Sequence, residues 1–149
     1  MKERVMLPVV AVVVGMIVAF IFMIAIESYS HSIYPTPEGL NPMDPADKEK
    51  FQAFLDTAPL GMFGIVLLGH IVASFFGGFI ASLINKRRSR RAALVVGMLL
   101  TMAGIVNLSA FVYPTWFGIM DLPCYIIFAW LGSKLIKKEK NETKKYTFQ

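Results

Sequence analysis

The chain has 149 residues, a formal net charge of +5 and a hydrophobic content of 56%, with only 17% charged residues. Such a balance is unusual for a soluble domain, and the length leaves room for a single domain. The positive charge does not indicate nucleic-acid binding, because no basic groove or stacking platform accompanies it. The only cysteine, Cys124, excludes an internal disulfide and a thiol-exchange pair.

Four long apolar segments follow one another along the chain. Each has about 20 residues or more, which is enough to cross a hydrocarbon core of about 30 Å as a helix. The first is longer than a signal-peptide core and no small-residue cleavage site follows it, so we expect it to be retained. The predicted spans are residues 5–27, 59–84, 92–113 and 116–136. The sequence therefore predicts an all-α integral membrane four-helix bundle, one domain over residues 1–136, with a basic tail at 137–149.

The basic residues give the predicted bundle an orientation. Thirteen of the fifteen Lys and Arg residues lie before the first span, in the connection Lys86–Arg91, or from Lys134 onward. Only Lys48 and Lys50 lie on the other side. Because short loops rich in Lys and Arg stay in the cytoplasm, we expect both termini inside and residues 28–58 outside. The expected location is a bacterial plasma membrane, with the lipid bilayer as partner and no nucleic acid.

The predicted external loop divides into two parts. Prolines and Gly39 make its first part irregular. Asp44 then reads as a helix cap with Pro45 at the first helical position. Apolar side chains follow at helical spacing from Phe51 to Ala58. We expect a short amphipathic helix here, lying on the membrane surface or over the mouth of the bundle. A helical run-in to the second span is the alternative.

Small residues at spacings of four predict where the spans pack. Helices in a membrane approach one another closely where their side chains are small. The second span carries two such rows and is the expected centre of the bundle, and the third span offers Gly97 and Gly104. The same faces could instead join copies of the chain or a larger membrane complex. The predicted packing residues are Gly15, Gly69, Ala73, Gly77, Gly78 and Ala81.

Polar residues inside the spans are the candidate functional residues, because they are costly in hydrocarbon and usually face the interior of a bundle. Counting along the helices places Glu27 at the outer end of the first span, and Asn107 and Asp121 in the outer half. His70 falls near the middle, about 16 Å below the outer end. About 8 Å would then separate His70 from Asp121, a gap that one water could bridge. The candidate cluster is Glu27, His70, Asn107, Asp121 and Tyr125.

Each member of this cluster also has a purely structural interpretation. His70 could be a neutral hydrogen-bonding group between helices, and Asn107 could join helices in the same way. Glu27 could lie among the lipid headgroups, and Asp121 could cap a helix that starts late. A haem held by two histidines is disfavoured because only His70 lies at depth. No spacing supports a metal site, so we expect no cofactor and no metal.

Two stretches, Gly69–Ala81 and Pro114–Leu122, are similar to a loose set of small, uncharacterised four-helix membrane proteins of bacteria. The resemblance implies the same topology and brings no activity with it. Small quinone-linked thiol oxidoreductases are a second likeness, but the chain lacks their paired cysteines.

The sparse chemistry favours a non-enzymatic role, as an accessory subunit or a small-molecule-binding membrane protein. Two alternatives stay open. The polar cluster could serve a proton-coupled transporter or a channel-like protein, because histidine changes charge close to neutral pH. The chain could also be an intramembrane enzyme acting on a lipid or a quinone.

Overall fold

The computed structural model describes residues 2–42, 44–85 and 90–136, and contains only helices within those ranges. The expected basic tail and most of the Lys86–Arg91 connection lie outside the described residues. Four helices are long and apolar enough to cross a membrane, as expected of a multi-pass membrane protein. The elements are α1 Lys2–Ile33, a 3-10 turn η1 Pro45–Asp47, α2 Lys48–Thr57, α3 Leu60–Ile84, α4 Arg91–Ala110 and α5 Thr115–Lys134.

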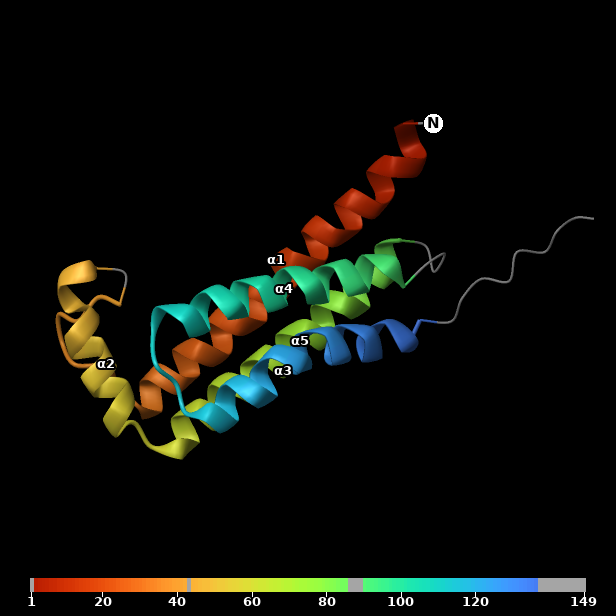
Figure 1. Ribbon diagram of the computed structural model, residues 1–149. Helices are drawn as coiled ribbons and strands as arrows, with labels where there is room; N and C mark the ends of the chain where they lie inside the picture. Colours follow the sequence, from red (N-terminus) through yellow and green to blue (C-terminus); the bar gives the residue numbers. More distant parts are fainter. Residues whose placement is uncertain (1, 43, 86–89, 137–149) are drawn as a thin grey trace, which may run out of the picture.

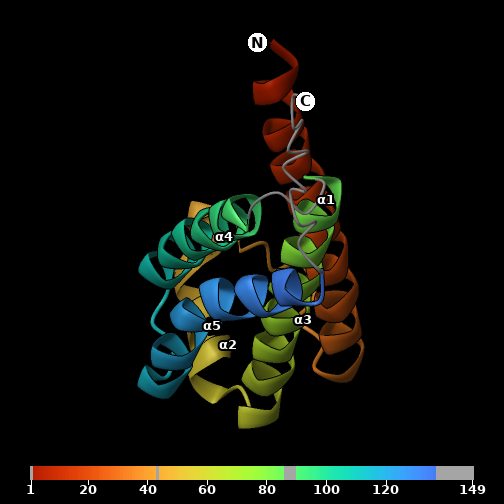
Figure 2. The ribbon, with the colours of Figure 1, turned by 90° about the vertical axis from the view of Figure 1, so that its right-hand side faces the viewer.

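The helices are arranged around α3, as the small-residue pattern predicts. α3 contacts α1 on one side and α5 on the other, and α5 in turn packs against α4 (Figure 1). A view along the bundle shows α5 between α4 and α3, with α1 beyond α3 (Figure 2). α1 and α4 contact each other less extensively, and α1 does not contact α5 among the described residues. We call the end near α2 the α2 end, and the opposite end, with Arg91 and Lys134, the basic end.

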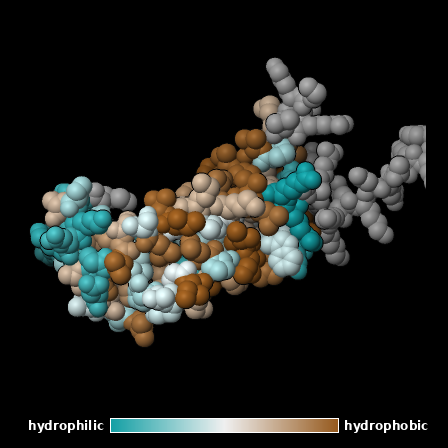
Figure 3. All heavy atoms as spheres, in the orientation of Figure 1, coloured by the Kyte–Doolittle hydropathy of each residue, from teal (hydrophilic) through white to brown (hydrophobic). Residues whose placement is uncertain are grey.

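The surface agrees with a membrane setting. Apolar side chains occupy most of the middle of the molecule, and hydrophilic ones gather at its ends, one group lying over α2 (Figure 3). Large apolar side chains of all four long helices are exposed, for example Ile24, Leu68, Val106 and Ile119. In water such a surface would be unfavourable, whereas lipid tails solvate it.

The first span is longer than predicted. α1 has 32 residues, or about 48 Å at 1.5 Å per residue, and it continues six residues past Glu27. The serine-rich exit suggested a loop, but the Ser32 hydroxyl donates to the Tyr29 carbonyl, a contact that a helix tolerates. The helix ends just before Pro35, where the residue preceding a proline is pushed out of helical geometry. The predicted boundary at Glu27 is therefore wrong by almost two turns.

Two adjacent glycines hold α3 against different neighbours. A Cβ built on Gly77 would lie 2.9 Å from the Gly15 carbonyl oxygen of α1, and one built on Gly15 would lie 2.7 Å from the Gly77 carbonyl oxygen. A Cβ on Gly78 would instead overlap the backbone of Ala129 in α5. All the predicted packing residues are buried: Gly15, Gly69, Ala73, Gly77, Gly78 and Ala81. These contacts show which helix each small face meets.

The α2 segment forms where the sequence predicts a helix start. The Asp44 side chain accepts a hydrogen bond from the Ala46 N–H at 2.9 Å, and Pro45 follows in the first turn. Asp47 accepts the Asn41 N–H at 3.1 Å, a bond that lowers the pKa of its carboxyl group. On the apolar face of α2, Leu55 is buried and Phe51 packs at the edge of the Phe111 ring, 4.9 Å away. These contacts lay α2 against the ends of the long helices.

The glycine contact between α3 and α5 makes a stability prediction. We expect Gly78→Ala to lower the thermal unfolding temperature in detergent, with a loss of about 1–3 kcal/mol, because the new methyl group meets helix backbone that cannot move aside. Gly64→Ala is the matched control in the same helix, since a Cβ there meets nothing within 4 Å. Equal unfolding temperatures for the two variants would contradict the assigned interface.

Candidate functional site

A cavity of about 870 Å³ occupies the α2 end of the bundle. α1 and α4 form its two side walls, α3 and α5 its floor, and α2 with the preceding loop closes its end. Gly15, Gly77 and Val96 bring α1, α3 and α4 together, and the cavity lies on the α2 side of this contact. A volume of this size is in the range of sites for small organic molecules.

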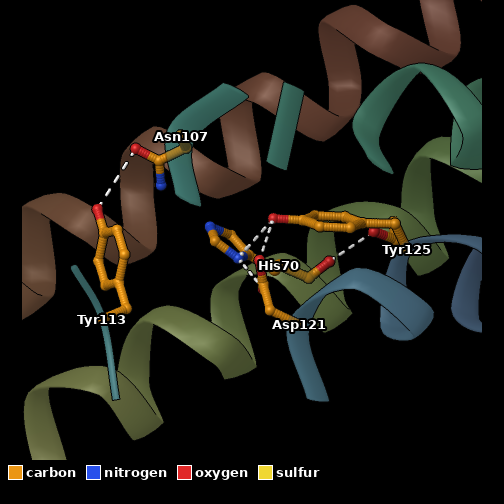
Figure 4. A network of polar contacts seen from close by, with 6 residues as sticks. His70, Asn107, Tyr113, Asp121 and Tyr125 are labelled. Carbon is orange, nitrogen blue, oxygen red and sulfur yellow. Dashed lines mark hydrogen bonds and ion pairs between the residues drawn. The ribbon is translucent and has the colours of Figure 1, made fainter. Parts of the chain in front are cut away.

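His70, Asp121 and Tyr125 form a buried hydrogen-bonded group at the floor of the cavity (Figure 4). His70 Nδ1 lies 2.5 Å from Asp121 Oδ1 and 2.8 Å from the Tyr125 hydroxyl oxygen. The Tyr125 hydroxyl donates to Asp121 Oδ2 at 3.0 Å. Since both carboxylate oxygens accept a bond, the geometry fits an ionised Asp121 and a proton on His70 Nδ1. Asp121 is only 1% exposed, so its charge depends on these two donors.

The register of two parallel helices produces this contact. His70 and Asp121 are 51 positions apart, and so are Gly78 and Ala129, which touch two turns further along. Helices that run in the same direction with the same rise keep such pairs level with one another. The predicted gap of about 8 Å between His70 and Asp121 is therefore wrong, because it assumed that the two helices start at equal depth and ignored the reach of the side chains.

The second ring nitrogen of His70 faces the cavity. It lies on the side of the ring away from Asp121 and Tyr125, toward Asn107 and Tyr113 (Figure 4). No described residue forms a hydrogen bond to this Nε2 atom, although 96% of the His70 surface is buried. A carboxylate that holds the Nδ1 proton leaves Nε2 as a hydrogen-bond acceptor or a proton acceptor. The sequence marked His70 but gave no sign of which nitrogen would be available.

Glu27 lies much deeper than predicted. Because α1 continues to Ile33, Glu27 is about 9 Å short of the helix end rather than at it. Ile26 packs on Gly69, where a Cβ would lie 3.0 Å from Ile26 Cγ2, so Glu27 and His70 are at nearly the same level. Glu27 lines the cavity, and no described residue pairs with its carboxylate. The cavity thus has an unpaired carboxylate in its α1 wall.

Asn107 does not join the buried group. Its side-chain oxygen accepts a bond from the Tyr113 hydroxyl at 3.4 Å, and both residues line the cavity nearer to α2. Burial raises the pKa of the Tyr113 hydroxyl, so this group stays a neutral donor. The structure therefore brings together His70, Asp121 and Tyr125, places Glu27 and Asn107 in the wall of the same cavity, and leaves Asn107 with a local partner.

Aromatic rings surround the buried group. The Tyr125 ring lies 5.2 Å from the imidazole of His70, and Phe117 lies 6.4 Å from it. Phe63 packs against Phe117 at 5.8 Å between ring centroids. Apolar periodicity marks Phe63 and Phe117 only as members of the helices, so the sequence did not identify them as cavity residues.

The side chain of Gln52 fastens α2 over the cavity. It accepts the Val112 N–H at 2.8 Å and donates to the Val112 carbonyl at 2.9 Å. This pair of bonds ties α2 to the connection between α4 and α5. A lone glutamine on the polar face of a short helix carries no signal in the sequence that would reveal this role.

No group of three or more His, Cys, Asp and Glu residues that could hold a metal ion occurs within the described ranges. No family model, no curated protein and no solved structure matches the chain.

The Gln52 bonds lead to a prediction about how firmly α2 is held over the cavity. We expect Gln52→Ala to speed amide hydrogen exchange in Phe51–Thr57 and at Val112, because α2 loses both bonds to the α4–α5 connection. Glu49→Ala, an exposed change on the same helix, is the control and should leave these rates unchanged. Slow exchange in both variants would mean that the aromatic contacts alone hold α2 in place.

Proposed function

We propose that the protein binds a small organic molecule in the cavity between α1 and α4, and that it does so without chemical turnover. The observation that carries this proposal is His70. A buried imidazole oriented by Asp121 and Tyr125 presents an unpaired nitrogen to a cavity of suitable size. Largely apolar sites with a few converging polar groups are typical of ligand-binding sites in proteins.

The proposed orientation follows from the charge distribution. With both termini in the cytoplasm, as the basic residues favour, the cavity and α2 belong to the outer side of a bacterial plasma membrane. The ligand then comes from outside the cell or from the outer leaflet. Similarity to a loose set of small bacterial membrane proteins would imply the same topology.

Binding accounts for the packing better than a channel does. At the basic end, Gly15 meets Gly77 and Gly78 meets Ala129 with no room for a Cβ, so α3 is closed against both neighbours. A cavity that is closed at one end can hold a molecule but provides no continuous path. An accessory role in a larger membrane complex is compatible with such a binding site.

A proton-coupled transporter is the second candidate, and the direct contact between His70 and Asp121 favours it. A histidine paired with a carboxylate at depth can take up and release a proton near neutral pH. Transport would also require α3 to separate from α1 or α5 at the basic end. An enzyme acting on a lipid or quinone has less support, since no Ser, Thr or Cys of the described residues is hydrogen-bonded to His70 Nε2.

Photolabelling in lipid nanodiscs tests ligand access to the cavity. Adamantyl diazirine is a small apolar probe, and Leu100 and Phe117 line the cavity while each is only 1% exposed. We expect the probe to label these two residues, because a molecule confined to the surrounding lipid cannot reach them. Val66→Trp should abolish this labelling, since Val66 lines the cavity and an indole would fill it.

Leu68→Trp is the matched control, because Leu68 lies on the same helix, is 54% exposed and does not line the cavity. It should leave the labelling of Leu100 and Phe117 intact. Absence of labelling at both residues in the unaltered protein would overturn the proposed binding function.

Reporter fusions test the proposed orientation. A fusion at Asp47 should report an external location, and one after Lys145 should report the cytoplasm, because the basic residues flank the other side of the spans. Fusion at Leu40, in the same connection as Asp47, should agree with Asp47. The opposite pair of signals would refute the orientation.

A further inference from the structure

The α2 end of the molecule is acidic, in contrast to the basic end. The connection between α1 and α3 contains five acidic residues and two lysines. Among the described residues, two acidic side chains, Glu27 and Asp44, and one lysine, Lys48, line the cavity. An excess of one charge around a low-dielectric cavity raises the local concentration of ions of the opposite sign. The electrostatic field at this cavity therefore favours cations.

The buried group needs one positive charge. When His70 carries a second proton, its charge balances that of Asp121, and the pair is neutral overall. When His70 is neutral, the charge of the fully buried Asp121 is left without a counter-charge. An uncompensated charge inside a membrane protein is unfavourable, so a cation near His70 Nε2 would stabilise the deprotonated state.

The walls near His70 suit an organic cation. The rings of Phe117 and Tyr125 lie 6.4 Å and 5.2 Å from the imidazole, and Phe63 packs on Phe117. Glu27 is at the same level on the α1 side. Aromatic faces attract cations, most strongly those of low hydration such as alkylammonium groups. Small inorganic cations would instead require several oxygen ligands, which the floor of the cavity does not offer.

We propose that the cavity takes an amphipathic organic cation, an alkylammonium with an apolar body, and that this cation and a second proton on His70 exclude each other. The proposal rests on the binding function proposed above and names the chemical class of its ligand. The ammonium lies between Nε2 and Glu27, and the apolar body lies along the cavity between α1 and α4.

The exchange balances in charge and in protons. In the proton-bound state His70 is an imidazolium paired with Asp121, and no cation occupies the cavity. When one cation enters, the Nε2 proton leaves to water at the α2 end, and the total charge of the site is unchanged. Binding then releases one proton for each cation. No bond other than the N–H bond of Nε2 is broken.

Other titratable groups also face the cavity and could affect its pH dependence. They come from three parts of the lining: Glu27, His31 and Tyr34 from α1 and its end, Asp44 and Lys48 from the α2 segment, and Tyr113 and Tyr125 from α5 and its approach. His31 is the other histidine of the chain. His31 is exposed and bonded to Thr36, so it serves as the control residue.

Competition against the photoprobe tests the ligand class. The two competitors are benzyltrimethylammonium, which is charged at every pH, and its uncharged isostere neopentylbenzene. Each is titrated against adamantyl diazirine labelling of Leu100 and Phe117 in nanodiscs at pH 8. We expect Asp121→Asn to raise the half-protecting concentration of the cation by about tenfold or more and to leave that of the isostere unchanged. Each competitor is compared between the unaltered protein and Asp121→Asn, so its partition into lipid affects both half-protecting concentrations equally.

The pH dependence tests the exclusion of proton and cation. Because a second proton on His70 and the cation exclude each other, protection by the cation should strengthen as the pH is raised, whereas protection by the isostere should not change. His70→Gln should remove this pH dependence, and His31→Gln should retain it. Retention of the isostere's protection in each variant shows that the variant is folded.

The outcomes separate the two proposals. If the isostere protects both residues and Asp121→Asn does not weaken protection by the cation, the binding function stands and the proposal of a cationic ligand is wrong. A pH dependence that persists in His70→Gln also overturns the exchange. If neither probe nor competitor reaches Leu100 and Phe117, the binding function itself fails.

Discussion

The close approach of α3 to two neighbours at once is the constraint on which the structure depends. Gly77 meets α1 and Gly78 meets α5, because adjacent positions are about 100° apart around the helix axis and face different neighbours. Hydrophobic burial cannot drive helices together inside lipid, so small residues that allow backbone contact determine where they meet. Contact at this level fixes the register of α3 with α5, and the same register places His70 beside Asp121. The cavity lies on the α2 side of this contact, between α1 and α4.

The buried group depends on the interface between α3 and α5. Asp121 needs donors to remain ionised in a low-dielectric interior, and His70 and Tyr125 supply them. The bonds orient the imidazole, which leaves one nitrogen directed at the cavity. Packing of α3 on α5 therefore positions these polar side chains, and the hydrogen bonds among them determine which nitrogen of His70 faces the cavity.

The sequence predicted the spans, the small faces and the identity of the polar residues, because hydropathy and spacing are local properties. It failed where the answer depends on register or on a helix end. Glu27 was assigned to the surface because a serine-rich stretch resembles a loop, yet α1 continues to the next proline. The depth of His70 relative to Asp121 was wrong because sequence spacing cannot show how far one helix is shifted along another. The Gln52 bonds and the aromatic floor arise only from tertiary contacts.

The two ends of the bundle have different mechanical roles. At the basic end, backbone lies on backbone, and any separation of α3 from its neighbours would lose many close contacts at once. At the α2 end, two hydrogen bonds from one glutamine and a few aromatic contacts hold the cover in place. Opening at the α2 end is therefore much less costly than opening at the basic end. A molecule in the cavity would enter and leave on the same side, so the structure as it stands suits reversible binding, and transport would need a second arrangement of α3.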